Sequence, residues 1–316
     1  MNQQVDAANL LRRFVIITGK GGVGKSAMAA TLGLLSAQRG DKTLICELNA
    51  HERTPSLLGH KDSGPKVTRL EENLWSVNIN PQAAMQEYGL LKLKYKSVAR
   101  LVFDNPMVGA LVKFLPGVND LLMLGKAFNH EREVDDTGKP VWDRVIVDAP
   151  ASGHSLTFLT LPRVIMEAVP SGNMHRESAD MWRLLSDPER SAIHIVSLPE
   201  ELPVTETMEL YDRLVNVHSL PVASIIINQM PERAVPPELE MPFRAWKTPP
   251  DDPGVNALWL AGKHRQREYH SAVSLTEQLK SLECETVFLP RFASVDFGRS
   301  TIENLTTAIR GQLNDG

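Results

Sequence analysis

The sequence is poor in cysteine, has no long apolar run and carries no positive excess of charge. Its 316 residues include only two cysteines, Cys46 and Cys284, which excludes a disulfide framework or a four-thiolate metal site within one chain. No segment reaches the roughly 18 apolar residues that a membrane span needs. The first residues lack the basic flank and apolar run of a signal peptide. We therefore expect a cytoplasmic protein.

The formal net charge is −4 at neutral pH. Domains that bind nucleic acid usually carry a positive excess, because phosphate contacts dominate their affinity. The charge balance therefore argues against a nucleic-acid partner. Hydrophobic residues make up 42% of the chain, which is enough to bury a substantial core.

Short apolar runs alternate with segments of helical periodicity along most of the chain. The runs that indicate strands are RRFVIIT, KTLICELN, NLWSVNI, RVIVDAP, SAIHIVSLP, ASIIINQM and ETVFLPRF. A helix over 298–313 follows the last of them. This alternation predicts an α/β fold with a doubly wound, mostly parallel sheet and right-handed crossovers. We expect a single domain over residues 1–316.

Two regions interrupt this alternation. Residues 81–135 contain many apolar positions at helical spacing, which predicts a helical insert between strands, with residues 163–190 packing nearby. Residues 231–254 contain seven of the 21 prolines. Because proline interrupts regular structure, this second region is predicted to be a surface loop rather than a helix.

The segment GKGGVGKS satisfies the phosphate-binding pattern G-x-x-x-x-G-K-[ST], and it lies between a predicted strand and a predicted helix. Backbone N–H groups of such a loop, together with the helix N-terminus, cradle phosphate oxygens. Lys25 would neutralise the β- and γ-phosphates, and the Ser26 hydroxyl would reach Mg²⁺. The residues expected to bind the nucleotide here are Gly19, Gly21, Gly22, Val23, Gly24, Lys25, Ser26 and Ala27.

A magnesium site of this class also needs an acidic residue at the end of another buried strand. The run RVIVDAP supplies Asp148 at such a position. A lone aspartate at a strand end often caps a helix instead. Together with the loop, however, it predicts that Ser26 and Asp148 hold Mg²⁺ beside ATP or ADP.

The loop contains a second lysine, Lys20, and this K-G-G-V-G-K-[ST] form resembles the deviant Walker A ATPases. The stretch DAPASGHSLTFLTLP, over 148–162, is similar to a signature of the ArsA and tail-anchored-protein targeting ATPases. Further segments that resemble this family are PEELPVTET, INQMP and FLPRF. The resemblance implies a single-domain, ArsA-like enzyme that hydrolyses ATP to ADP and phosphate.

The same resemblance implies a homodimer that encloses two nucleotides. In such a dimer, Lys20 would reach the partner's phosphates and stabilise developing charge on the transferred phosphoryl group. The alternative for Lys20 is a solvated surface lysine. The resemblance further implies that Asn228 contacts adenine, and that Pro290 and Phe292 belong to the segment covering the base.

The chain departs from this family just after its second predicted strand, where an aspartate usually orients the attacking water. Asn49 occupies that position, and Glu47 lies two residues before it. An amide orients water but cannot accept its proton, so we expect slow or partner-dependent hydrolysis. If Glu47 replaces the aspartate, its carboxylate becomes essential. The cysteine pair with which the targeting ATPase binds zinc is missing, so no zinc is expected.

For the helical insert, the resemblance implies a groove that closes over an apolar helix of a client protein. Methionines such as Met107 and Met181 suit varied apolar partners. The alternative is that these apolar residues pack together as core. The basic stretch LKLKYKSVAR could contact acidic lipid transiently, or it could form a solvated helix face.

These features favour a dimeric switch that couples ATP binding and hydrolysis to a client or partner protein. A positioning ATPase similar to MinD or ParA is an alternative, although the closing TTAIRGQLNDG has no basic amphipathic character. A nucleotide-gated scaffold with slow turnover is a further alternative, suggested by Asn49.

Overall fold

The computed structural model describes residues 5–48, 52–80, 118–149, 155–292 and 296–314. Within them, one sheet has eight strands in the order β4-β5-β3-β6-β2-β7-β8-β9. The strands are β2 (Phe14–Thr18), β3 (Thr43–Glu47), β4 (Thr68–Glu71), β5 (Leu74–Asn78), β6 (Arg144–Asp148), β7 (Ser191–Ser197), β8 (Val222–Met230) and β9 (Glu285–Pro290). Only the β4–β5 pair is antiparallel. The predicted α/β fold class with a mostly parallel sheet is confirmed.

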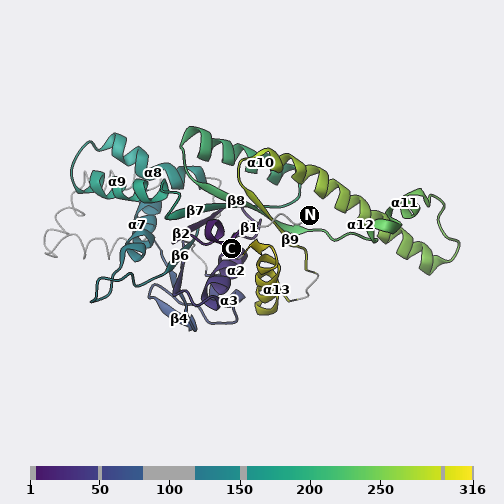
Figure 1. The fold of residues 1–316 in the computed structure, drawn as a ribbon, viewed down its shortest axis with the longest axis horizontal. Helices are drawn as coiled ribbons and strands as arrows, with labels where there is room; N and C mark the ends of the chain where they lie inside the picture. The colour runs from purple at the N-terminus through teal and green to yellow at the C-terminus, as the bar shows by residue number, and fades with distance from the viewer. Residues whose placement is uncertain (1–4, 49–51, 81–117, 150–154, 293–295, 315–316) are drawn as a thin grey trace.

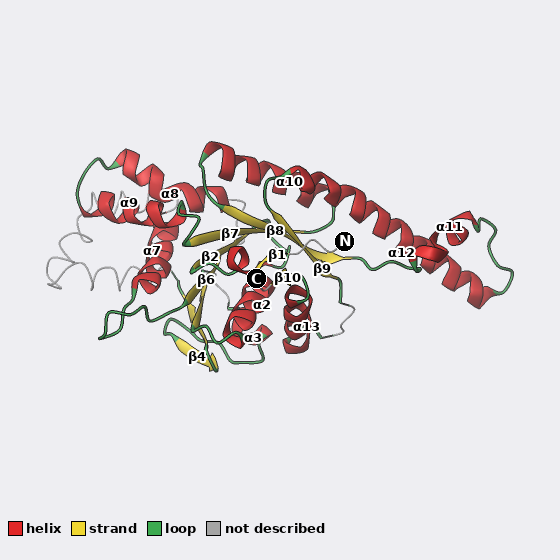
Figure 2. Cartoon of the chain, viewed as in Figure 1, coloured by secondary structure: helices red, strands yellow, loops and turns green. Residues whose placement is uncertain are grey.

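Helices cover both faces of the sheet, as Figure 1 and Figure 2 show. On one face lie α1 (Ala7–Leu10), α2 (Lys25–Gln38), α3 (Thr54–Leu57) and α13 (Arg299–Arg310). The other face carries α7 (Val118–Arg132), α8 (Ser155–Ala168), α9 (Asn173–Leu185) and α10 (Glu201–Asp212), which continues into η1 (Arg213–Val217). A separate two-stranded sheet pairs β1 (Val5–Asp6) with β10 (Leu313–Asn314).

The central strand β2 contributes to a core on each side of the sheet. Phe14 and Ile16 pack in the cluster that includes α7 to α10, whereas Val15 and Ile17 pack with α2 and α13. Every residue of β2 is buried, as expected for a parallel strand covered on both faces. This explains why the run reads as continuously apolar instead of alternating.

The parallel register brings the polar ends of several strands to one edge of the sheet. Glu47 and Asp148 are the last residues of β3 and β6, and they are paired directly. Asp148 also pairs with Ile17, next to the point where β2 enters the glycine-rich loop. Ligand sites of open α/β sheets form at this carboxyl edge.

The prediction of a surface loop over 231–254 is wrong, because α11 (Pro237–Ala245) is helical and α12 (Pro253–Glu277) begins within the same stretch. Pro237 and Pro253 each lie in the first turn of their helix, where proline is tolerated. Pro242 lies inside α11 and costs it a backbone hydrogen bond. Lys263 of α12 donates to the carbonyl oxygens of Phe243 and Arg244 in the last turn of α11, which have no acceptor role within the helix. This contact ties the end of α11 to α12.

Only part of the predicted helical insert falls in the described residues, because 81–117, including Met107, lie outside them. The part within the predicted insert is α7, whose Leu121 and Leu124 pack in one apolar cluster with Phe158 of α8 and Met181 of α9. These described side chains are core rather than an open groove. None of the described helices has both the length and the apolarity needed to cross a bilayer. The boundaries of the single domain and its insert stay a prediction.

Candidate functional site

The loop between β2 and α2 has the backbone geometry of a phosphate cradle. Gly19, Gly22 and Gly24 all adopt positive φ angles, of 135°, 85° and 102°. A Cβ atom at Gly19 would collide with the backbone oxygen of Val196, and one at Gly24 would collide with the Asn228 amide. Glycine is therefore required at both positions by conformation and by space. Lys25 follows as the first residue of α2.

An open cavity of about 630 Å³ lies against this loop, a size suited to a small ligand. Its lining residues come from five parts of the chain that are far apart in sequence. They are Gly22, Gly24, Lys25, Ser26, Ala27, Glu52, Arg53, Ser56, Leu57, Ala149, Asn228, Gln229 and Phe297. The loop, the segment after β3, the end of β6, the end of β8 and the stretch before α13 thus meet at one cavity.

Lys25 and Asp148 form a buried pair of opposite charges at the base of the loop. Lys25 is only 5% exposed, and its Nζ donates a 2.8 Å hydrogen bond to the backbone oxygen of Lys20. Burial lowers the pKa of Lys25, while the charge of Asp148 opposes that shift. Burial raises the pKa of Asp148 to about 6, against the hydrogen bond with Ser26 and the charge of Lys25. Desolvation is therefore the dominant effect on both groups.

The contact between Ser26 and Asp148 fits the expected magnesium site. Their hydroxyl and carboxylate oxygens are hard ligands of the kind that Mg²⁺ prefers. Among the described residues, no three His, Cys, Asp or Glu side chains gather closely enough to form a metal site by themselves. Because Mg²⁺ at nucleotide sites takes most of its ligands from phosphate and water, one or two protein oxygens suffice.

Glu47 is fully buried, and its carboxylate holds the chain segment that follows β3. Its oxygens accept N–H bonds from Arg53 at 2.5 Å and from Thr54 at 3.2 and 3.3 Å. Burial raises the pKa of Glu47 to about 7, with a further contribution from Asp148, and the two backbone donors oppose the rise. Glu47 does not line the cavity. Asn49 lies outside the described residues.

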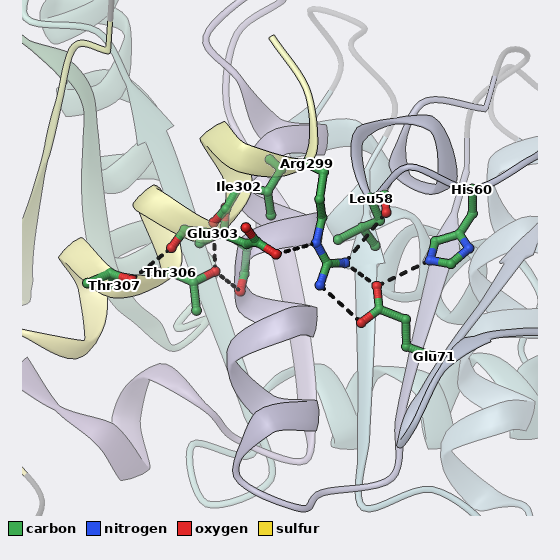
Figure 3. Close-up of polar contacts among 9 residues, drawn as sticks. Leu58, His60, Glu71, Arg299, Ile302, Glu303, Thr306 and Thr307 are labelled. Carbon is green, nitrogen blue, oxygen red and sulfur yellow. Dashed lines mark hydrogen bonds and ion pairs between the residues drawn. The ribbon is translucent and has the colours of Figure 1, made fainter. Parts of the chain in front are cut away.

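A second anchor fixes the other end of the segment that contains Arg53. Arg299, at the start of α13, forms a bidentate ion pair with Glu71 at the end of β4 (Figure 3). It also donates to the backbone oxygen of Leu58, just after α3. Glu303 binds the same guanidinium at 2.7 Å. Helix α13 therefore holds the end of this segment at Leu58, and Glu47 holds its beginning at Arg53.

The two lysines of the loop have different surroundings. Lys20 does not line the 630 Å³ cavity, but it lines a separate cavity of about 300 Å³ between the loop and α10. Its Nζ forms an ion pair with Glu206 of α10, in which the side chains of Lys20 and Glu206 are 42% and 36% exposed. Lys20 is therefore neither buried with Lys25 nor freely solvated.

The residues expected near adenine occupy two different places. Asn228 is 6% exposed and lines the cavity, and its Nδ2 donates to the backbone oxygen of Val23 at 2.9 Å. Pro290 ends β9 opposite Met230, and Phe292 packs against the apolar cluster of α2 and α13. Neither Pro290 nor Phe292 lines the cavity. Their contact with a base stays a prediction.

Sequence reasoning missed three polar residues of this region. Arg53 lines the cavity, and its charge lowers the pKa of both Lys25 and Asp148. Gln229 also lines it, in a left-handed backbone conformation with φ of 59° that is uncommon outside glycine. Glu206 pairs with Lys20 across 186 positions. Gln229 and Glu206 both lie in segments that resemble the family, INQMP and PEELPVTET, whereas Arg53 lies in none of them.

Comparison with known proteins supports the assignment of the loop. A model of the anion-transporting ATPase family matches residues 12–178. ATPase BagA of Mycobacterium tuberculosis is 30% identical over 233 residues, which cover 72% of this chain and 67% of the relative. ATPase GET3 of Kluyveromyces lactis is 22% identical over 253 residues, covering 69% and 72%. An ATPase ASNA1 homolog of Entamoeba dispar is 25% identical over 267 residues, covering 69% and 76%.

Proposed function

This chain belongs to the anion-transporting ATPase family, and we propose that it is a dimeric switch that couples ATP binding and hydrolysis to a partner protein. Family membership supports the nucleotide-binding and ATPase part of the proposal. The dimer and the partner protein are inferred from the arrangement of the two lysines and from the similarity of this chain to its relatives.

The observation that carries the proposal is the separation of Lys20 from Lys25. Lys25 points into the fold beside Asp148, where it neutralises phosphates bound in its own loop. Lys20 lies on the side of the loop that faces α10, with its side chain 42% exposed. A cation in that place is available to a second subunit's phosphates once its ion pair with Glu206 opens.

Other residues of the cavity would bind the phosphates and the magnesium ion. The loop N–H groups bind phosphate oxygens, and Ser26 and Asp148 would hold Mg²⁺. When bound, that ion neutralises charge on the phosphates. The ammonium group of Lys25 has three N–H donors, and one of them bonds the backbone oxygen of Lys20. The others are available to phosphate oxygens while that bond holds the side chain beside the loop.

Arg53 adds a positive charge to the same cavity. Its guanidinium interacts electrostatically with both Lys25 and Asp148, and its backbone N–H is held by Glu47. A cation so placed would offset the charge of the phosphate chain within one subunit. We assign to Arg53 a role in phosphate binding, which substitution by alanine tests through ATP affinity.

Hydrolysis is expected to be slow. Asn49 cannot take a proton from water, and the Glu47 carboxylate is occupied by two backbone donors. These two observations also favour a second candidate function, a nucleotide-gated scaffold with little turnover.

The client of this ATPase is expected to be a protein with an apolar helix, and this chain itself is expected in the cytoplasm.

A mixing experiment tests the dimer. Lys20→Ala and Lys25→Ala are each expected to be inactive. Lys20→Ala lacks the lysine that acts on the partner's nucleotide, and Lys25→Ala lacks the lysine that acts on the subunit's own nucleotide. When they are mixed, each heterodimer regains one complete site, so the mixture should recover roughly a quarter of the wild-type rate. Steady-state ATPase activity and sedimentation with ATP or ADP are the measurements.

Three outcomes separate the candidates. Recovery on mixing supports the dimeric switch. If Lys20→Ala is fully active by itself and mixing adds no activity, Lys20 does not act on the partner's nucleotide. Nucleotide-dependent dimerisation without measurable turnover in the wild-type protein supports the scaffold.

A further inference from the structure

Helices α11 and α12 with their connecting loop extend away from the sheet, and we call them the arm (Figure 1). The first half of α12 contains no buried residue, whereas Gln266, Ala272 and Thr276 are buried in its second half. Large apolar side chains are exposed on both helices of the arm. They are Leu239 (53%), Met241 (72%), Leu258 (75%) and Leu260 (56%). Apolar exposure of this extent often marks an interaction surface.

The arm encloses a cavity of about 690 Å³ with an aromatic wall. Trp246 lies 6.5 Å from Phe243 and 6.4 Å from Trp259, measured between ring centroids. The Lys263 ammonium lies 4.7 Å from the Phe243 centroid and 5.5 Å from that of Trp259. A Cβ at Gly262 would come within 2.9 Å of the Phe243 ring, so this ring packs directly on the α12 backbone. The Phe243 ring thus rests on α12, and Trp246 extends the wall toward Trp259.

The polar lining of this cavity is mostly positive. Arg244, Lys247 and Arg267 line it and form no ion pair with any described residue. The lining includes one carboxylate, Glu240, which is already bound to His270 at 2.8 Å. The three cations therefore remain available to an anionic ligand.

The indole N–H of Trp259 does not face the cavity. This nitrogen is buried and has no hydrogen-bond acceptor among the described residues, and a carboxylate in the cavity would not reach it as the ring lies. The cavity is therefore defined for a ligand by its aromatic wall and its three cations.

We propose that the arm cavity binds an acidic protein segment that carries an aromatic or large apolar side chain next to its carboxylates. The side chain stacks on Trp246 and Trp259, and the carboxylates meet Arg267 and Lys247. A membrane surface fits less well, because a bilayer does not fill a cavity and Asp251 and Asp252 would repel anionic lipid. The interaction is separate from the proposed ATPase activity and does not depend on it.

Fluorescence anisotropy with labelled twelve-residue peptides tests the proposal on the full chain. One probe alternates Glu with Phe, a second replaces Phe with Ser, and a third replaces Glu with Lys. We expect the Glu/Phe probe to bind most tightly, and Arg267→Glu to weaken it about tenfold or more. Trp259→Phe, which keeps an aromatic ring but removes the N–H, should weaken it less.

Arg265→Glu is the matched control, because Arg265 lies on the same helix, does not line the cavity and pairs with Glu232. This control should change the dissociation constant less than about twofold. Circular dichroism and ATPase activity should be unchanged in all three variants, which separates this test from that of the proposed function.

Several results would overturn the proposal. The first is no saturable binding of the Glu/Phe probe. Another is equal binding of the probe without Phe. Equal loss in Arg267→Glu and Arg265→Glu would also refute the cavity as the site. Binding to vesicles of anionic lipid without binding to the peptide would replace the protein partner by a membrane. Self-association that Arg267→Glu abolishes would replace it by a second copy of the chain.

Discussion

The carboxyl edge of the sheet with the glycine-rich loop, which we call the nucleotide edge, buries its charged side chains, whereas the arm exposes several of its own. At the nucleotide edge Lys25, Asp148 and Glu47 are buried, and each has a partner within the fold. On the arm, Arg244 and Arg267 are exposed and unpaired among the described residues, beside a preformed aromatic wall. Buried charges must be compensated locally, and their pKa values shift as a result. Exposed cations on a rigid support keep their charge for a partner.

The largest expected effect is that of Lys25→Ala at the nucleotide edge. Removing the charge that contacts the phosphates should lower the turnover number by about 100-fold or more. The matched variant Lys263→Ala on the arm should leave turnover unchanged. ATPase assays on both variants make the comparison. Equal loss in both would show that the two regions are not independent.

The next effect is a change in how stability depends on pH. The pKa of Glu47 is raised from 4.5 to about 7, so the folded state holds a proton that the unfolded state loses between these values. Stability therefore falls as pH rises through that window, and Glu47→Gln should remove up to roughly 3 kcal/mol of this dependence. Urea unfolding at several pH values measures it.

Glu189→Gln is the control for this experiment, because that side chain is 80% exposed. It should leave the pH profile of stability unchanged. Asp148 acts in the same direction between pH 3.8 and about 6, so some dependence should persist in Glu47→Gln. A wild-type profile that rises between pH 4.5 and 7 would contradict the assignment. ATPase activity of Glu47→Gln, measured alongside, tests whether this carboxylate is also essential for hydrolysis.

A smaller effect is expected from Glu206→Gln, which releases Lys20 from its ion pair. Pairs with this exposure contribute about 1 kcal/mol or less, so ATP-dependent dimerisation should tighten by up to about fivefold. Sedimentation at several protein concentrations measures the change. Glu209→Gln, in the same small cavity, is the control. Weaker dimerisation in Glu206→Gln would mean that the pair supports the dimer and does not compete with it.

The smallest effect is expected within the arm. Lys263→Met keeps an apolar stem but removes the ammonium group that stacks on Phe243 and donates to the end of α11. The opening of α11 should become easier by about 1 kcal/mol, with no change at the nucleotide edge. Hydrogen exchange of α11 amides measures it. Faster exchange in α2 as well would show unexpected coupling.

Local patterns sufficed to predict most strands and the loop. The strands β2, β3, β5, β6, β7 and β9 fall within predicted runs, and β8 begins one residue before its run. A run of buried β-branched residues depends little on distant contacts, so it can be recognised without a structure. β4 was missed, because its four residues include Arg69 and Glu71 and form an edge. Helix α11 was missed, because Pro242 inside it and the prolines on either side favour a loop in the local sequence, while its contacts with α12 come from residues outside that stretch.

The candidate site divides in the same way. The chain itself determined the glycine-rich loop, with Lys25 and Ser26 at its end and Asp148 at a strand end, because each depends on conformation within a few residues. The tertiary structure alone decided that Glu206 holds Lys20 and that Arg53 faces Lys25. Those neighbours lie on segments that follow parallel strands, Glu206 in α10 after β7 and Arg53 after β3, and the order of these strands in the sheet differs from their order in the chain. No local pattern records which strand ends will meet.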